Sequence, residues 1–313
     1  MYTTPGHHHI SMLAKSALKT NHFYQNVLGL RRVKKTVNQD NPSMYHLFYG
    51  DLTGAAGTEL TFFEMPNLGR TVRGTNAISQ IGLLVPSFGS LLYWKYRFAS
   101  FDVKHGEITR YAGRDALPFE DEDGLRMILI NHNGEVIPEH WSAWQHADID
   151  EEHRILGIGP VEITVRHLER LLRTLTDKFG YVEASCSDEE AIVQSVAGQA
   201  IGEIIIKQKD GPSERPGRGS VHHLAIRVNN EVELRYWENI VRESGFSITG
   251  IVDRYYFQSL YFKESNGILF EIATDGPGFL ADSTIENLGK PLDLPPFLEG
   301  RRAEIEASLI PLE

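Results

Sequence analysis

The residues best suited to metal chemistry in this chain are two histidine clusters and one glutamate. The segment G-H-H-H-I-S holds His7–His9, and V-H-H-L-A holds His222–His223. Glu271 interrupts the apolar run I-L-F-E-I-A. An unpaired carboxylate buried in such a run would cost several kcal/mol or stay protonated, and a cation is one way to keep it ionised. These residue types therefore predict a metal site.

The elements that must position these residues belong to a fourfold internal repeat. Each copy reads as a short strand, a helix and then several strands, the last of them entered through a glycine. In three copies, the same number of residues separates a position on the first strand from the end of the following helix. In the fourth copy this separation is two residues longer. The paired positions are His9 and Gly29, Gln80 and Ser100, Pro160 and Gly180, and His223 and Gly245. The repeat predicts an α+β fold of four βαβββ modules, which pair to bury their open edges and apolar faces.

Comparing the four modules selects the ligands. The matching positions on the first strand are His9, Gln80, Pro160 and His223, and those on the last strand are Thr61, Ile128, Ile206 and Glu271. Only the first and fourth modules carry possible ligands, so we expect these two modules to pair. Two imidazoles and one carboxylate leave several positions of an octahedral ion open, as in non-haem Fe(II) enzymes. Alternation along a strand puts His8 and His222 on the opposite face, although a one-residue shift would exchange them with His9 and His223.

Composition and segment boundaries limit the remaining possibilities. A polar segment over residues 140–152 predicts two domains, 1–145 and 153–280, each of two modules, and a tail over 281–313 that packs on the body. The formal net charge of -11 argues against nucleic acid and anionic membranes as partners. No apolar run is long enough for a transmembrane helix, and Cys186 is the only cysteine. We expect a soluble cytoplasmic protein. The sequence leaves open whether it forms a homo-oligomer.

Several segments resemble one superfamily. The βαβββ modules, H-H-I-S, F-Y-Q-N-V-L-G-L and G-I-L-F-E resemble the vicinal oxygen chelate superfamily of glyoxalases, bleomycin-resistance proteins and type I extradiol dioxygenases. More narrowly, G-H-H-H-I-S, L-G-L-R-R-V-K-K-T-V-N-Q-D, Y-H-L-F-Y-G-D and D-R-Y-Y-F-Q-S-L-Y-F resemble bacterial ring-cleaving dioxygenases of the hydroquinone and catechol-2,3-dioxygenase type. The resemblance implies two glyoxalase-like domains and an enzyme that uses Fe(II), or Mn(II) as in some relatives. Its partners would be O2 and a hydroquinone or catechol, whose ring it opens.

The same resemblance assigns residue roles. It implies His9, His223 and Glu271 as metal ligands, and Tyr261 as the tyrosine near the substrate hydroxyl. Arg254 could steer an anionic oxygen or form a surface ion pair. Extradiol enzymes place an acid/base histidine shortly before the tyrosine, whereas this chain reads D-R-Y-Y there, so the proton-transfer residue is not assigned. The other histidines, His46 among them, have no repeat position and are predicted to be structural.

Two other classes of protein remain as alternatives. A glyoxalase-like isomerase or thiol-transfer resistance enzyme, with Ni, Zn or Mn, usually has a second glutamate as fourth ligand. Thr61 stands at that position and argues against this class, although Glu59 or Glu64 would enter the site if the register were shifted. A non-catalytic protein that binds an aromatic compound is the other alternative. A metal triad within apolar strands argues against it, because such a protein does not need one.

Overall fold

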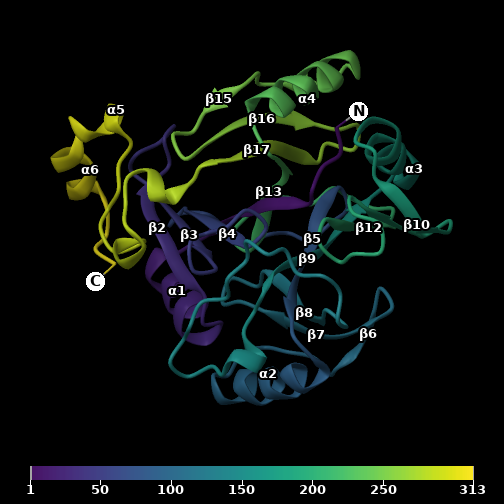
Figure 1. Ribbon diagram of the computed structural model, residues 1–313, viewed down its shortest axis with the longest axis horizontal. Coiled ribbons are helices and arrows are strands. Elements are labelled where there is room, and N and C mark those ends of the chain that lie inside the picture. The colour runs from purple at the N-terminus through teal and green to yellow at the C-terminus, as the bar shows by residue number, and fades with distance from the viewer. Residues whose placement is uncertain (1, 313) are drawn as a thin grey trace.

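The computed structural model describes residues 2–312, and its strands form two mixed sheets. The first and fourth modules supply one sheet, in the order β14-β16-β17-β13-β1-β4-β3-β2, with β15 paired to β16. The second and third supply the other, in the order β10-β11-β12-β9-β5-β8-β7-β6. The sheets lie side by side, with β13 against β5 (Figure 1). Each sheet thus combines modules from both halves of the chain, and the predicted pairing of first with last module is confirmed.

The elements of the first sheet come from the two ends of the chain. The first module contains β1 (His7–Ala14), α1 (Ala17–Asn21), a π-helical turn (His22–Val27), β2 (Arg31–Val37), β3 (Tyr45–Gly50) and β4 (Glu59–Glu64). The fourth contains β13 (Ser220–Val228), α4 (Glu231–Glu243), β14 (Ser247–Ile248), β15 (Val252–Asp253), β16 (Phe257–Lys263) and β17 (Leu269–Pro277). β1 pairs with β13 antiparallel, while β1–β4 and β13–β17 are parallel pairs.

The second sheet repeats this plan without the ligands. Its second module contains β5 (Ala77–Val85), α2 (Phe88–Ser100), β6 (Thr109–Tyr111), β7 (Arg114–Glu120) and β8 (Arg126–Asn131). A 3-10 turn (Glu151–His153) leads to the third module, with β9 (Gly157–Val165), α3 (Leu168–Arg173), a π-helical turn (Thr174–Lys178), β10 (Val182–Cys186), β11 (Glu190–Gln194) and β12 (Glu203–Gln208). β5 pairs with β9 antiparallel, as β1 does with β13. The four βαβββ modules predicted from the repeat are therefore present.

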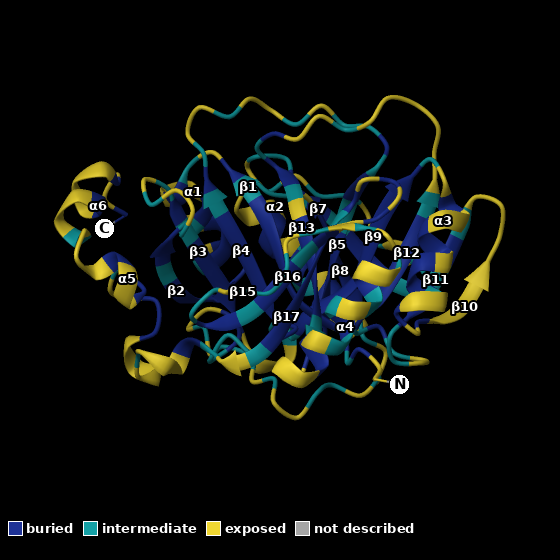
Figure 2. Ribbon diagram, turned by 90° about the horizontal axis from the view of Figure 1, so that it is seen from above, coloured by how far each residue is buried: buried dark blue, intermediate teal, exposed yellow. Residues whose placement is uncertain are grey.

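Local sequence explains where the module helices begin and end. Ser16, Ser87 and Asn230 each stand before a helix, and each side chain accepts a hydrogen bond from the backbone N–H three residues on. Gly29 follows the first helical segment with φ of 68°, a left-handed conformation that glycine adopts without a steric cost. The helices lie outside the sheets, and Figure 2 shows dark blue strands inside and yellow bands on the outer faces of the helices. Among the described residues, no helix is both long and apolar enough to span a membrane.

The C-terminal tail is attached to the first module through a buried lysine. It contains two 3-10 turns (Phe279–Ala281 and Ile285–Asn287), α5 (Pro296–Glu299) and α6 (Arg302–Ser308), which lie beside β2 (Figure 1). Lys34 of β2 is fully buried, and its Nζ donates to Asp282 at 2.8 Å and to Asp293 at 2.7 Å. The same Nζ lies 4.6 Å from the ring centroid of Tyr256, whose hydroxyl donates to Asp282. Two carboxylates and an aromatic ring therefore compensate for the burial of this charge.

Candidate metal centre

Three side chains from three adjacent strands meet inside the first sheet. His9 lies on β1, His223 on β13 and Glu271 on β17, and all are buried. Glu271 Oε2 lies 2.8 Å from His223 Nε2 and 3.1 Å from His9 Nε2, while the two Nε2 atoms are 3.3 Å apart. Two imidazole nitrogens and one carboxylate oxygen thus converge on one point, as the comparison of modules predicted, and form a group able to hold a metal ion.

The protonation states of Glu271 and His223 suit metal binding. Burial alone would raise the pKa of Glu271, but the facing imidazoles of His9 and His223 outweigh it and hold that pKa well below its usual range. Burial lowers the pKa of His223, partly offset by the same carboxylate. Glu271 Oε1 is sealed from solvent and has no hydrogen-bond partner among the described residues. An ionised carboxylate with an orphaned oxygen beside neutral imidazole is the donor set that a divalent transition metal takes.

Each ligand histidine is accompanied by its neighbour because both strands carry a bulge. The register between β1 and β13 shifts between His7 and Ile10. It shifts again between Ser11 and Met12, where His222 of β13 has no partner residue on β1. His8 Nδ1 lies 3.0 Å from His9 Nδ1, and His222 Nδ1 lies 2.8 Å from His223 Nδ1. The rings of His8 and His9 both contact Phe257. The expectation that His8 and His222 occupy the opposite face is therefore wrong, since a bulge interrupts the alternation on which it was based.

The neighbouring imidazole fixes the tautomer of the ligand in the first module. His8 Nε2 lies 3.1 Å from the carbonyl oxygen of Thr274, which only accepts, so His8 carries its proton on Nε2. His8 Nδ1 is then an acceptor, and His9 Nδ1–H donates to it. The lone pair of His9 consequently lies on Nε2, the atom that faces Glu271. His7 turns away, and its Nε2 donates to the carbonyl oxygen of Glu203 in the other sheet at 3.2 Å.

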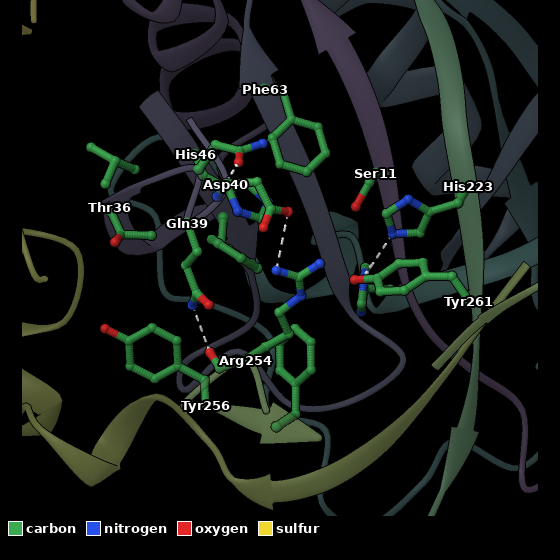
Figure 3. A pocket seen from close by; sticks show the side chains of 15 residues that line it. Ser11, Thr36, Gln39, Asp40, His46, Phe63, His223, Arg254, Tyr256 and Tyr261 are labelled. Carbon is green, nitrogen blue, oxygen red and sulfur yellow. Dashed lines mark hydrogen bonds and ion pairs between the residues drawn. The ribbon is translucent and has the colours of Figure 1, made fainter. Parts of the chain in front are cut away.

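A pocket opens beside the triad, with aromatic walls and polar groups at its ends (Figure 3). The lining residues are His9, Ser11, Thr36, Val37, Asn38, Gln39, Asp40, His46, Phe48, Phe63, His223, Arg254, Tyr256, Phe257 and Tyr261. All come from the first and fourth modules. A planar apolar ring with polar substituents is the kind of ligand that this lining suits.

Tyr261 and Arg254 both line this pocket. Tyr261 is the cross-strand partner of Glu271, and its ring centroid lies 5.5 Å from that of His223. Burial raises the pKa of Tyr261, so the phenol stays neutral and can donate a hydrogen bond. Arg254 Cζ lies 5.5 Å from the centre of the Tyr261 ring, and its Nη1 lies 3.2 Å from Asp40 Oδ2 at the mouth. The guanidinium thus forms an ion pair and also borders the pocket.

The structure also adds residues that sequence reasoning left out. His46, predicted to be structural, lines the pocket from β3 and places Nε2 3.0 Å from Thr61 Oγ1. Thr61 Oγ1 lies 2.7 Å from Ser11 Oγ, so a chain of polar atoms joins β3, β4 and β1. His46 has no counterpart in the repeat, and only the pairing of β3 with β4 brings it here. No signal in the sequence distinguished it from the other histidines.

The two glutamates considered as a fourth ligand are not part of the triad's group. Glu64 Oε1 accepts a hydrogen bond of 2.7 Å from the backbone N–H of Ala17, at the start of α1. Glu59 lies close to His8 and His9 but does not group with His223 and Glu271. Burial raises the pKa of Glu59 well above its usual value, with nearby carboxylates adding to the effect. Glu59 thus forms a separate candidate group with His8 and His9, and it is not part of the group formed by His9, His223 and Glu271.

Comparisons with known proteins identify the family to which this chain is related. Residues 157–272 match the Glyoxalase/Bleomycin resistance protein/Dioxygenase superfamily. The chain is 49% identical to "Putative ring-cleaving dioxygenase MhqA" of Bacillus subtilis (strain 168), covering 98% of this chain and 99% of that protein. It is 27% identical to the chlorohydroquinone/hydroquinone 1,2-dioxygenase of Sphingobium indicum, covering 96% and 94%.

A solved structure matches over the whole length. The crystal structure of a "putative dioxygenase" from Bacillus subtilis subsp. subtilis str. 168 superimposes with a TM-score of 0.92 at 32% identity, covering 100% of this chain and 99% of that one. Sequence and fold agree along the entire chain, including the modules that carry the triad. The protein therefore belongs to the glyoxalase/bleomycin resistance protein/dioxygenase superfamily, as a homologue of its ring-cleaving dioxygenases.

Proposed function

We propose that this protein is an Fe(II)-dependent dioxygenase that opens the ring of a hydroquinone or catechol with O2. His9, His223 and Glu271 would hold the ion through two imidazole nitrogens and one ionised carboxylate oxygen. An Fe(II) ion held by these three ligands would supply open positions for O2 and a substrate oxygen, and a route for electrons between them. The single observation that carries the proposal is the convergence of these three ligand atoms at a pocket with aromatic walls.

The other residues of the pocket orient the substrate and its protons. Phe48, Phe63 and Phe257 present aromatic faces against which a substrate ring packs and from which it excludes water. The neutral hydroxyl of Tyr261, next to His223, donates a hydrogen bond to the oxygen nearest the ligands. Arg254, behind that ring, offsets negative charge on a deprotonated substrate oxygen. Mn(II) fits the same donor set and is the other ion to test.

Oxygen consumption tests the proposal. Metal-free protein is loaded with Fe(II) without air and then mixed with hydroquinone, catechol or substituted forms of either. We expect O2 uptake with at least one of them, together with the absorbance of a ring-opened acid or aldehyde. The absence of uptake with every compound would refute the proposal.

The Glu271→Ala variant tests the site itself. It should lose both bound metal and turnover, because two buried imidazoles without a carboxylate form a poor site for a dication. Glu162→Gln is a matched control, since Glu162 is a buried carboxylate of the second sheet that pairs with Lys207 at 2.8 Å. This control should keep its metal and its activity. Full activity in Glu271→Ala would remove the assignment of the triad.

A further inference from the structure

His46 is one of the polar side chains that lie across the pocket from the triad. The strand order β13-β1-β4-β3 puts it two strands from β1, about 10 Å away at the usual spacing of neighbouring strands. Its ring lies between two phenylalanines, with centroid distances of 4.1 Å to Phe48 and 4.2 Å to Phe63. The neighbouring rings hold the imidazole in place at the end of the pocket away from the ligands.

The two ring nitrogens of His46 have different surroundings. Nε2 is held by Thr61, whose hydroxyl is itself hydrogen-bonded to Ser11. Nδ1 has no hydrogen-bond partner among the described residues, and it is not among their polar atoms sealed from solvent. Burial, followed by the charges of nearby histidines, lowers the pKa of His46 well below its usual value. A neutral imidazole thus offers one unused nitrogen to the pocket, as donor or acceptor according to its tautomer.

Of the other polar side chains at this end of the pocket, Gln39 and Asp40 have partners, whereas Thr36 Oγ1 is sealed from solvent and has no hydrogen-bond partner among the described residues. Gln39 Nε2 donates to the carbonyl oxygen of Arg254 at 2.8 Å, and Asp40 is an exposed residue paired with the Arg254 guanidinium. These contacts join the loop between β2 and β3 to the segment before β16 across the opening. His46 Nδ1 is therefore an unpaired nitrogen at this end and, unlike Thr36 Oγ1, is not sealed from solvent, so it is available to a ligand.

We propose that His46 Nδ1 binds the substrate oxygen farthest from the metal, and so makes the site selective for a para-dihydroxylated ring. This inference rests on the proposed function, because it takes the first oxygen to be placed at the triad. The second oxygen of a catechol is adjacent to the first and stays beside the ligands. The second oxygen of a hydroquinone is at the opposite end of the ring, past the phenylalanine walls, where His46 lies. Leaving Nδ1 and that hydroxyl unpaired in an apolar pocket carries a free-energy penalty, which gives the selectivity.

Two isosteric variants separate the ring nitrogens. The amide of asparagine reaches the position of Nδ1, so His46→Asn keeps a polar atom toward the pocket and loses the contact with Thr61. The amide of glutamine reaches the position of Nε2, so His46→Gln keeps the contact with Thr61 and loses the atom toward the pocket. His46→Phe removes both polar atoms and matches the aromatic neighbours. The measurement is the dissociation constant of hydroquinone and of catechol for the Fe(II)-loaded protein without air, followed by kcat/KM for both in air.

The variants are expected to divide into two groups. His46→Gln and His46→Phe should each weaken hydroquinone relative to catechol by about tenfold or more, the usual effect of one unpaired buried polar group. His46→Asn should keep the wild-type preference, and Fe(II) content should not change in any variant. Equal losses of affinity for hydroquinone and catechol would overturn the inference, and so would the same ring preference in His46→Asn and His46→Gln. A wild-type protein that prefers catechol, or that binds neither ring, would also overturn it. Failure of the proposed function would be seen differently, as bound hydroquinone with no consumption of O2 by the wild type. If His46→Phe does not fold, the comparison of His46→Asn with His46→Gln still tests the inference.

Discussion

At the scale of single residues, the site depends on one carboxylate that serves two imidazoles. Glu271 Oε2 is within 3.1 Å of both ligand nitrogens, although the residue is fully buried. A bound metal ion would offset the cost of burying that charge. Tyr261 lies on the adjacent strand directly opposite Glu271, so its hydroxyl is held close to the ligands by backbone pairing. The triad and the tyrosine are therefore one structural unit.

Replacing Tyr261 with Phe separates metal binding from chemistry. The variant should keep its Fe(II), because Tyr261 is not a ligand, and should lose about 100-fold in kcat, within the usual range for one hydrogen-bond donor or proton-transfer group. Anaerobic metal titration and steady-state O2 uptake measure the two quantities. A variant with wild-type kcat would show that the hydroxyl does not act in the reaction, and one without metal would show that it acts through the site.

At the scale of elements, the two bulges decide which histidines meet. The repeat in the sequence selects His9 and His223, the pair that meets Glu271, because equivalent strands place equivalent residues at the sheet centre. It does not reveal the bulges, since an inserted residue leaves the apolar pattern of Ile10 and Met12 unchanged. The bulge in β1 turns His8 from the far face to a position where it accepts a hydrogen bond from His9. Strand periodicity alone could not predict this contact.

The bulge in β1 predicts a difference between two adjacent histidines. His8→Ala should raise the dissociation constant for Fe(II) by about 10–100-fold, because His9 loses the partner that fixes its tautomer and ring orientation. His7→Ala is the matched control, since His7 is equally buried but bonds to Glu203 in the other sheet. Its metal affinity should equal that of the wild type. Competition with a coloured chelator measures both constants, and equal affinities in the two variants would contradict the role given to His8.

At the scale of the whole molecule, the same module plan builds one sheet that carries the triad and one sheet that does not. The second sheet has the same order and similar register shifts in β5, but Gln80 and Pro160 stand where the first sheet has His9 and His223. The fourfold plan and the pairing of the first with the last module could be predicted from the sequence, because repeat spacing and ligand positions both depend on it. The pocket could not, because its walls combine the loop between β2 and β3 with the segment before β16. Those contacts arise between segments far apart in the chain and leave no periodic signal.

Buried histidines make the stability of the metal-free protein depend on pH. Burial lowers the pKa of His7 to about 4, against about 6.5 in an unfolded chain. Between these values the unfolded state binds more protons, so the contribution of His7 to stability is complete above about pH 6.5 and falls as the pH drops toward 4. The stability advantage of the wild type over His7→Gln should therefore shrink by about 1 kcal/mol per pH unit from pH 6 to pH 5. Urea unfolding at several pH values measures this difference in stability. A difference that does not change with pH would contradict the lowered pKa of His7.

The origin of the oxygen atoms in the product tests the central claim most directly. Fe(II)-loaded protein is mixed with hydroquinone under ¹⁸O2, and the mass of the ring-opened product is measured. The triad and its pocket predict that both labelled atoms enter the product with the wild type and that Glu271→Ala forms none. A wild-type product without label from O2, or no ring-opened product from any dihydroxylated ring, would contradict the proposed function of this site.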